Sequence, residues 1–108
     1  MENPLKTAIC EDRPEDAALL VDYISRSGIA AACEVFPSGE ELLNGFFAGR
    51  YDLIFLDIYM QGMRGIDAAE KIREKDESVV LAFTTTSRDH ALESYRLGAL
   101  KYLEKPVK

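Results

Sequence analysis

Four groups of polar residues follow apolar stretches of the chain, and their types suit one piece of chemistry. Glu11 and Asp12 follow the first stretch, Asp57 ends the second, residues 84–86 (all Thr) end the third, and residues 105–106 (Lys-Pro) follow the fourth. Carboxylates bind divalent cations, a single carboxylate can accept a phosphoryl group, and a hydroxyl and an ammonium can bind the oxygens of that group. If the four groups meet in space, they predict a phosphorylation switch.

The order of the predicted strands and helices indicates that the four groups do meet. Apolar strand-like stretches alternate with helical segments, with no linker or internal repeat, which is typical of an α/β domain with a parallel sheet and helices on both faces. We expect five strands and four helices. The carboxyl ends of parallel strands lie along one edge of a sheet, where ligands bind. The strands are expected at residues 7–10, 33–36, 53–56, 79–83 and 100–103.

The third strand is predicted to be central, because residues 53–56 are apolar at every position and a strand covered on both faces needs no polar alternation. Asp57 would then lie at the floor of a cleft. The helices are expected to begin near Pro14, Ser38, Asp67 and Ser87, and Ser38 with Glu41 forms a capping box. The inward side chains predicted for these helices are Ala17, Leu20, Val21, Ile24, Leu42, Leu43, Phe46, Phe47, Ala69, Ile72, Ala91, Leu92 and Tyr95.

Composition predicts one globular domain spanning residues 1–108. The chain is 47% hydrophobic and 30% charged, and its net charge of -6 without a basic run argues against direct binding of nucleic acid. No stretch is long enough for a membrane span and no signal segment is present, so a cytoplasmic location is expected. Cys10 and Cys33 are predicted to be small buried apolar residues without a disulfide.

The acidic groups predict a magnesium site. Glu11, Asp12 and Asp57 would repel one another in one place unless a cation were present, and ligands that are all oxygen suit Mg²⁺. Sheet geometry directs Lys105 toward the same pocket, and Thr85 is the hydroxyl expected to donate to a phosphoryl oxygen.

Taken in order, these residues resemble the receiver domain of bacterial two-component response regulators. The resemblance lies in residues 10–12, 51–60, 83–85 and 98–106 and covers nearly the whole chain. Residues 89–100 with 105–106 are similar to receivers that precede LytTR-type DNA-binding domains. The resemblance implies a doubly wound, flavodoxin-like sheet with the strand order 2-1-3-4-5.

The resemblance also implies roles for the acidic residues. Asp57 would accept a phosphoryl group from a partner sensor histidine kinase, so the domain would catalyse only its own phosphorylation and dephosphorylation. Glu11, Asp12 and Asp57 would bind Mg²⁺ together with the backbone carbonyl of Tyr59.

The remaining implied roles concern switching. Thr85 and Lys105 would bind the phosphoryl group, and the ring of Tyr102 would follow the Thr85 hydroxyl inward. This movement would remodel the surface of the fourth helix and fifth strand and control an output domain, with transcription regulation through a LytTR-type DNA-binding domain as the expected outcome.

Three positions depart from the family pattern. Gln61 stands where proline is common, which is expected to loosen the loop after Asp57. Thr86 replaces a small residue, which narrows access to the phosphoryl group. The chain also ends at Lys108, where a fifth helix should begin, so we expect a piece of a longer regulator without its C-terminal helix and output domain, or a homodimer that covers the exposed part of the sheet.

Three other interpretations stay open from the residues. A phosphatase of the haloacid dehalogenase type needs a second Asp two residues after the nucleophile, where this chain has Tyr59. A flavodoxin-like FMN carrier would place phosphate beside Glu11 and Asp12, which repel it. A pseudo-receiver would bind partners without phosphorylation. His90, the sole histidine, is expected to be a solvated residue in the first turn of a helix.

Overall fold

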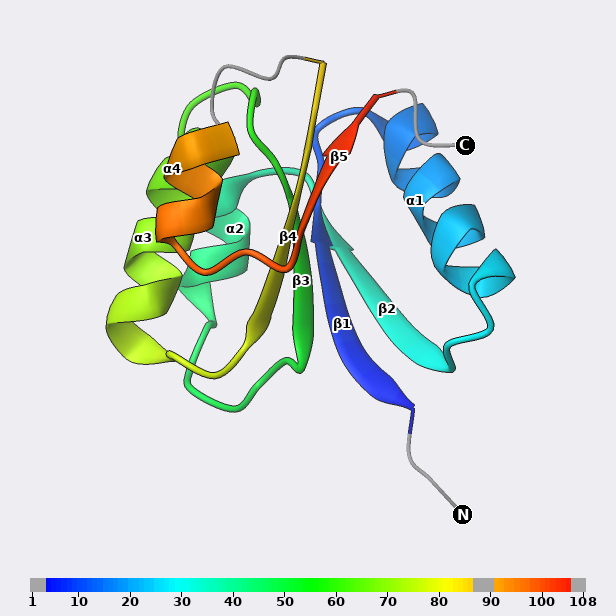
Figure 1. The fold of residues 1–108 in the computed structure, drawn as a ribbon, viewed down its shortest axis with the longest axis horizontal. Helices are drawn as coiled ribbons and strands as arrows, with labels where there is room; N and C mark the ends of the chain where they lie inside the picture. The colour runs from blue at the N-terminus through cyan, green and yellow to red at the C-terminus, as the bar shows by residue number, and fades with distance from the viewer. Residues whose placement is uncertain (1–3, 87–90, 106–108) are drawn as a thin grey trace.

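A five-stranded parallel sheet forms the centre of the molecule (Figure 1). The computed structural model describes residues 4–86 and 91–105. The strand order β2-β1-β3-β4-β5 and the doubly wound fold confirm the prediction. The elements along the chain are β1 (Leu5–Cys10), α1 (Pro14–Arg26), β2 (Ala31–Phe36), α2 (Gly39–Asn44), β3 (Leu53–Asp57), α3 (Gly65–Lys75), β4 (Val80–Thr85), α4 (Ala91–Arg96) and β5 (Lys101–Glu104).

Helices lie on both faces of the sheet, with α1 on one face and α2, α3 and α4 on the other (Figure 1). The side chains of β3 alternate between the two faces. Ile54 and Leu56 pack into the core under α2 and α3, whereas Phe55 packs with Ile9 and Leu20 under α1. The third strand is therefore central and covered on both faces, as its uninterrupted apolar sequence predicted.

Several helix boundaries follow from local sequence signals. Pro14 is the first residue of α1, where its missing N–H costs no hydrogen bond. The hydroxyl of Ser38 accepts a hydrogen bond from the backbone N–H of Glu41 at 3.1 Å, which caps α2. Gly28 follows the end of α1 with a φ of +82°, a conformation that suits glycine. The predicted helix start at Ser87, as well as His90 and Pro106, lies outside the described residues.

Two predictions of burial near the edge of the sheet are wrong. Cys33 is exposed, because β2 is an edge strand whose middle residues are not covered by a helix, whereas Cys10 on β1 is fully buried. Both thiols are free. Val21 is 39% exposed, since the inward side of α1 is narrower than predicted and consists of Ala17, Leu20 and Ile24.

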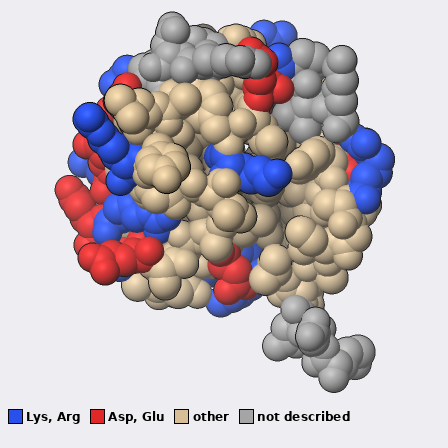
Figure 2. All heavy atoms as spheres, viewed as in Figure 1, with Lys and Arg blue, Asp and Glu red and all other residues tan. Residues whose placement is uncertain are grey.

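The predicted inward sides of α2 and α4 also need correction. Phe47 lies beyond α2 and is 59% exposed. On α4, Leu92 and Tyr95 are 65% and 80% exposed, and the buried residue is Ser94, whose hydroxyl donates to the carbonyl of Ala91. In the view of Figure 2, uncharged residues cover much of this face of the molecule, with a Lys or Arg side chain near its centre.

A groove of about 130 Å³ lies beside α1 on its face of the sheet. Apolar side chains of α1, β3, β4 and β5 line it, including Tyr23, Phe55, Ala82 and Leu103. The fifth helix expected from the sequence stays a prediction. Within residues 4–86 and 91–105, no helix is long and apolar enough to cross a membrane.

Candidate functional site

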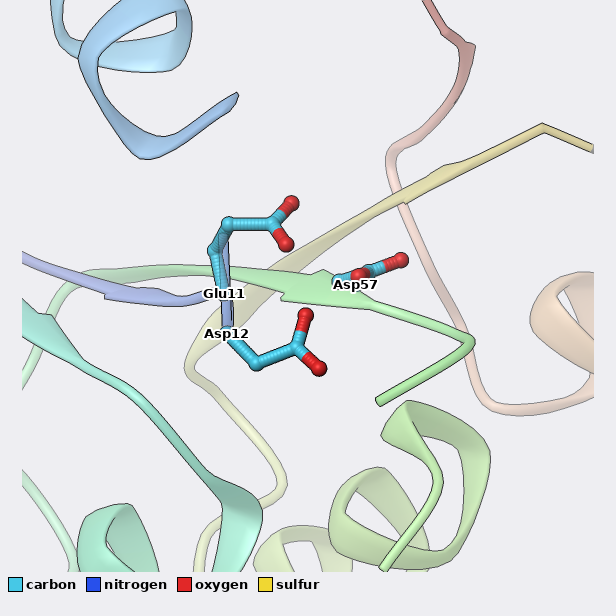
Figure 3. A group of neighbouring side chains, drawn as sticks. All are labelled: Glu11, Asp12 and Asp57. Carbon is cyan, nitrogen blue, oxygen red and sulfur yellow. The ribbon is translucent and has the colours of Figure 1, made fainter. Parts of the chain in front are cut away.

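The predicted site residues lie at the carboxyl ends of adjacent strands. Asp57 is the last residue of β3, Glu11 and Asp12 directly follow β1, and Lys105 directly follows β5. Figure 3 shows the carboxylates of Glu11, Asp12 and Asp57 on the same side of these strand ends. An oxygen of each carboxylate lies within 4.8 Å of an oxygen of the other two. Glu11 and Asp57 are buried, with exposed fractions of 2% and 3%.

The ammonium of Lys105 contacts this acidic group from the side of α1. Its Nζ lies 2.7 Å from Glu11 Oε1 and 3.3 Å from Asp57 Oδ2. It also lies 3.1 Å from Oδ2 of Asp16, a residue of α1 for which the sequence predicted no role. The Lys105 side chain is only 12% exposed, so these ion pairs are largely shielded from solvent.

The loop between β3 and α3 supports the acids through backbone N–H groups. The N–H of Tyr59 donates to Asp57 Oδ1 at 3.2 Å, and the N–H of Gln61 donates to Asp12 Oδ2 at 3.2 Å. A proline at position 61 would have no N–H to donate. The residue that was expected to loosen this loop therefore ties it to Asp12.

Gly65 closes the same loop against the strand end. Its N–H donates to the carbonyl of Ile58 at 2.9 Å. A Cβ atom at this position would lie 2.2 Å from the backbone oxygen of Asp57 and 2.8 Å from its carbonyl carbon. Only glycine fits here without moving Asp57, and the sequence signal was limited to a glycine at the start of a helix.

The threonines at the end of β4 divide between the two faces of the sheet. Thr84 pairs with Asp57 in the strand register, and its fully buried hydroxyl has no hydrogen-bond partner among the described residues. It lines a small cavity with Lys105 on the α1 face. Thr85 is also fully buried, and its carbonyl accepts a hydrogen bond from the backbone N–H of Lys105 at 2.6 Å. Successive residues of a strand point to opposite faces, so Thr85 faces away from this cavity.

Tyr102 lies on β5 opposite Phe83 of β4. Its ring is partly buried and packs against the core on the side of α2 and α3. Thr85 and Tyr102 therefore share the face on which α4 lies, whereas Lys105 extends toward α1. Their predicted role as a switch pair stays a prediction.

Burial raises the pKa values of two acids of the site. Burial raises the pKa of Glu11 to about 7, with Lys105 opposing the shift and Asp57 adding to it. The pKa of Asp57 is also raised, mainly by burial, although Glu11 and Lys105 oppose that shift. Burial alone would lower the pKa of Lys105, but hydrogen bonds to Glu11 and Asp16 and the charge of Asp57 raise it above its ordinary value. The site favours additional positive charge.

The donor set fits a magnesium ion. Glu11, Asp12 and Asp57 offer only carboxylate oxygens, which are the ligands that Mg²⁺ prefers. A divalent ion would stabilise the charged forms of Glu11 and Asp57, whose pKa values burial raises. Tyr59 lies two residues beyond Asp57 in the loop, and the role of its carbonyl stays a prediction.

Comparison with known proteins gives one consistent family. The response regulator receiver domain matches residues 7–108. The transcriptional regulatory protein RprY of Bacteroides fragilis is 31% identical over 108 residues, which is 98% of this chain and 45% of that protein. The sensory transduction protein LytT of Oceanobacillus iheyensis is 31% identical over 100 residues, 91% of this chain and 41% of that protein.

A solved structure agrees with these sequence matches. The response regulator protein TrrA of Thermotoga maritima, in complex with Mg²⁺-BeF, is 30% identical, with a TM-score of 0.78 over 94% of this chain and 86% of that chain. The LytT match also agrees with the predicted LytTR-type subfamily. The chain spans less than half the length of the curated relatives it matches.

Proposed function

Because the chain belongs to the response regulator receiver domain family, we propose that it is a phosphorylation-dependent switch with Asp57 as the phosphoacceptor. One observation carries the proposal. The Asp57 carboxylate is 3% exposed at the end of the central strand, with two other carboxylates within 4.8 Å and the Lys105 ammonium at 3.3 Å.

The proposed reaction is the transfer of a phosphoryl group from a phosphohistidine of a sensor kinase. A carboxylate oxygen of Asp57 attacks phosphorus, the bond between phosphorus and the histidine nitrogen breaks, and an acyl phosphate forms. Glu11, Asp12 and Asp57 would hold Mg²⁺, which when bound neutralises charge on the phosphoryl oxygens. Lys105 contacts Asp57 already and would bind one of those oxygens.

The proposed output is a change of the surface formed by α4 and β5. The Thr85 hydroxyl would move toward the phosphoryl group, and the ring of Tyr102, which lies on the neighbouring strand, would follow it. The exposed side chains Leu92, Tyr95 and Leu100 belong to this region and would change their surroundings.

The proposed partners follow from the relatives. RprY is named a transcriptional regulatory protein and LytT a sensory transduction protein, and both are more than twice as long as the segment that this chain matches. We therefore propose that this receiver controls an attached output domain, DNA-binding and LytTR-type, in the cytoplasm, where a histidine kinase supplies the phosphoryl group.

The test is the mass of the intact protein after incubation with acetyl phosphate and Mg²⁺. One phosphoryl group should be added to the wild type, and none to Asp57→Asn, since an amide is not a nucleophile here. Asp67→Asn is the matched control, because it removes an exposed carboxylate that pairs with Arg64 and should leave phosphorylation unchanged. Equal modification of Asp57→Asn and wild type would refute the assignment.

A further inference from the structure

The ammonium of Lys105 is shared among three carboxylates. Its distances to Glu11, Asp16 and Asp57 are 2.7, 3.1 and 3.3 Å. The contact with Asp16 is a hydrogen bond, whereas those with Glu11 and Asp57 are close ion pairs. A phosphoryl oxygen that engages Lys105 must therefore compete with carboxylates that already contact its ammonium.

Asp16 is the partner that does not belong to the acidic group around Asp57. It comes from the first turn of α1, whereas Glu11 and Asp57 come from strand ends. The shortest contact among the three is to Glu11, whose side chain is 0% exposed. Asp16 is 25% exposed and can return to water, so its contact costs least to break.

The contact between Asp16 and Lys105 lies beside a small cavity. Asp16, Thr84 and Lys105 line a cavity of about 10 Å³, which holds at most about one water molecule. Glu11 and two residues of α1, Leu19 and Leu20, complete its wall. Because water has little access from this side, the attraction between Asp16 and Lys105 is screened less than that of an ion pair on the open surface.

The neighbouring residue Glu15 offers a direct contrast. It lies in the same first turn, its side chain is 65% exposed, and it pairs with Arg13 at 3.2 Å. Arg13 also approaches Asp16, but only to 3.7 Å and with a side chain that is 66% exposed. Both acids lie near the N-terminus of α1, where the helix dipole stabilises negative charge, so the two do not differ in this stabilisation.

We propose that Asp16 is a positioning residue that competes with the phosphoryl group for Lys105. It draws the ammonium toward α1 in the resting state and so weakens the binding of a phosphoryl group at Asp57. The inference rests on the proposed function, since it concerns the lysine of that site.

The test is the affinity for beryllofluoride in saturating Mg²⁺, measured by titration of the amide spectrum. Asp16→Asn should bind beryllofluoride about threefold to tenfold more tightly than wild type, a change of about 0.7 to 1.4 kcal/mol. Glu15→Gln removes the same charge from the same helix turn and should change the affinity by much less. The affinity for Mg²⁺ alone should be similar in Asp16→Asn and wild type, because Asp16 does not belong to the acidic group of Glu11, Asp12 and Asp57.

The same substitution made in a variant without the lysine shows whether Asp16 acts through Lys105. In Lys105→Ala, the additional change Asp16→Asn should no longer tighten beryllofluoride binding. Equal effects of Asp16→Asn and Glu15→Gln, a persistent effect without Lys105, or unchanged or weaker binding in Asp16→Asn would each overturn the inference. Melting curves of every variant report separately on folding.

Failure of the proposed function would give a different result. In that case the wild type itself would show no Mg²⁺-dependent binding of beryllofluoride, or Asp57→Asn would bind it equally well. Normal binding by the wild type with no gain in Asp16→Asn would overturn the role of Asp16 alone.

Discussion

The two sides of Asp57 differ in their balance of acidic and basic groups. Toward β1 and the loop after β3, the carboxylates of Glu11 and Asp12 lie near Asp57, and the described structure gives Asp12 only the backbone N–H of Gln61 as a hydrogen-bond donor. Toward α1, the single cation Lys105 is shared by three acids. One side lacks positive charge, and the other has a cation that several acids share.

Glu11 joins the two sides, because it faces both Asp57 and Lys105. Burial raises its pKa, and the neighbouring Lys105 opposes that shift only in part. This difference between the two sides indicates that a metal ion and a phosphoryl group would act on separate parts of the site. The ion would complete the acidic side, and the phosphoryl group would redistribute the donors of Lys105.

The largest expected effect comes from disturbing the close packing of Gly65 against the backbone of Asp57, the residue that lies between the two sides. Gly65→Ala places a methyl group against the backbone carbonyl of Asp57, so the strand end or the start of α3 must move. We expect a loss of about 3 kcal/mol or more in the free energy of unfolding, together with weaker binding of Mg²⁺. Urea unfolding measures the first and titration the second.

Gly45→Ala is the control for this change. Its new methyl group would meet only the end of the Arg50 side chain, which can move away. A loss of stability in Gly65→Ala no larger than that in Gly45→Ala would contradict the close fit of the loop against Asp57.

The second prediction concerns pH and uses Glu11, the residue common to both sides. Its pKa rises from 4.5 to about 7 on folding, so between these values the folded protein binds more protons than the unfolded chain. Without Mg²⁺, this group therefore lowers stability as the pH rises from about 4.5 to about 7, by at most about 3 kcal/mol. The raised pKa of Asp57 acts in the same direction.

Comparison with Glu11→Gln isolates the effect, because glutamine does not titrate. Asp76, whose pKa is lowered mainly by a hydrogen bond from the Gly49 N–H, stabilises the fold at higher pH in both proteins and cancels in the difference. The stability of wild type relative to Glu11→Gln should fall across this pH range. A flat or rising difference would mean that Lys105 fully compensates the acids.

The smallest expected effect is the stabilisation by Mg²⁺, which should differ between variants on the two sides of Asp57. At about ten times its Kd, Mg²⁺ should stabilise the wild type by about 1.4 kcal/mol. Asp12→Ala should lose most of this gain, because it removes a ligand. Lys105→Ala should show a larger gain than wild type, because the ion then compensates acids that the lysine no longer neutralises. Melting curves with and without Mg²⁺ measure both variants, and changes of the same sign would show that the two sides do not differ as described.

Much of the site could be predicted because a parallel sheet brings distant strand ends together. Alternating strand and helix signals, and a central strand apolar at every position, were sufficient to bring Glu11, Asp57 and Lys105 to one edge. Local capping at Ser38 and the helix start at Pro14 followed from short-range chemistry that needs no tertiary contact.

Exposure at the edges was harder to predict, since it depends on what packs against each element. Cys33 and Val21 have apolar side chains, yet their positions on an edge strand and at the side of a helix leave them in contact with solvent. The same holds for Leu92 and Tyr95 on α4. The hydrophobic pattern of a segment indicates how apolar that segment is. It does not indicate how much of the segment's surface a neighbouring helix or strand covers.

The sequence by itself determined the fold class, the strand order expected from the family resemblance, and the residue types that meet at the carboxyl edge. Tertiary structure alone decided which atoms contact one another there. The pairing of Asp16 with Lys105 joins residues 89 positions apart, and the tie from Gln61 to Asp12 joins residues 49 apart. Such contacts depend on how a helix turn or a loop lies above the sheet to within about 1 Å, and composition and periodicity carry no information on that scale.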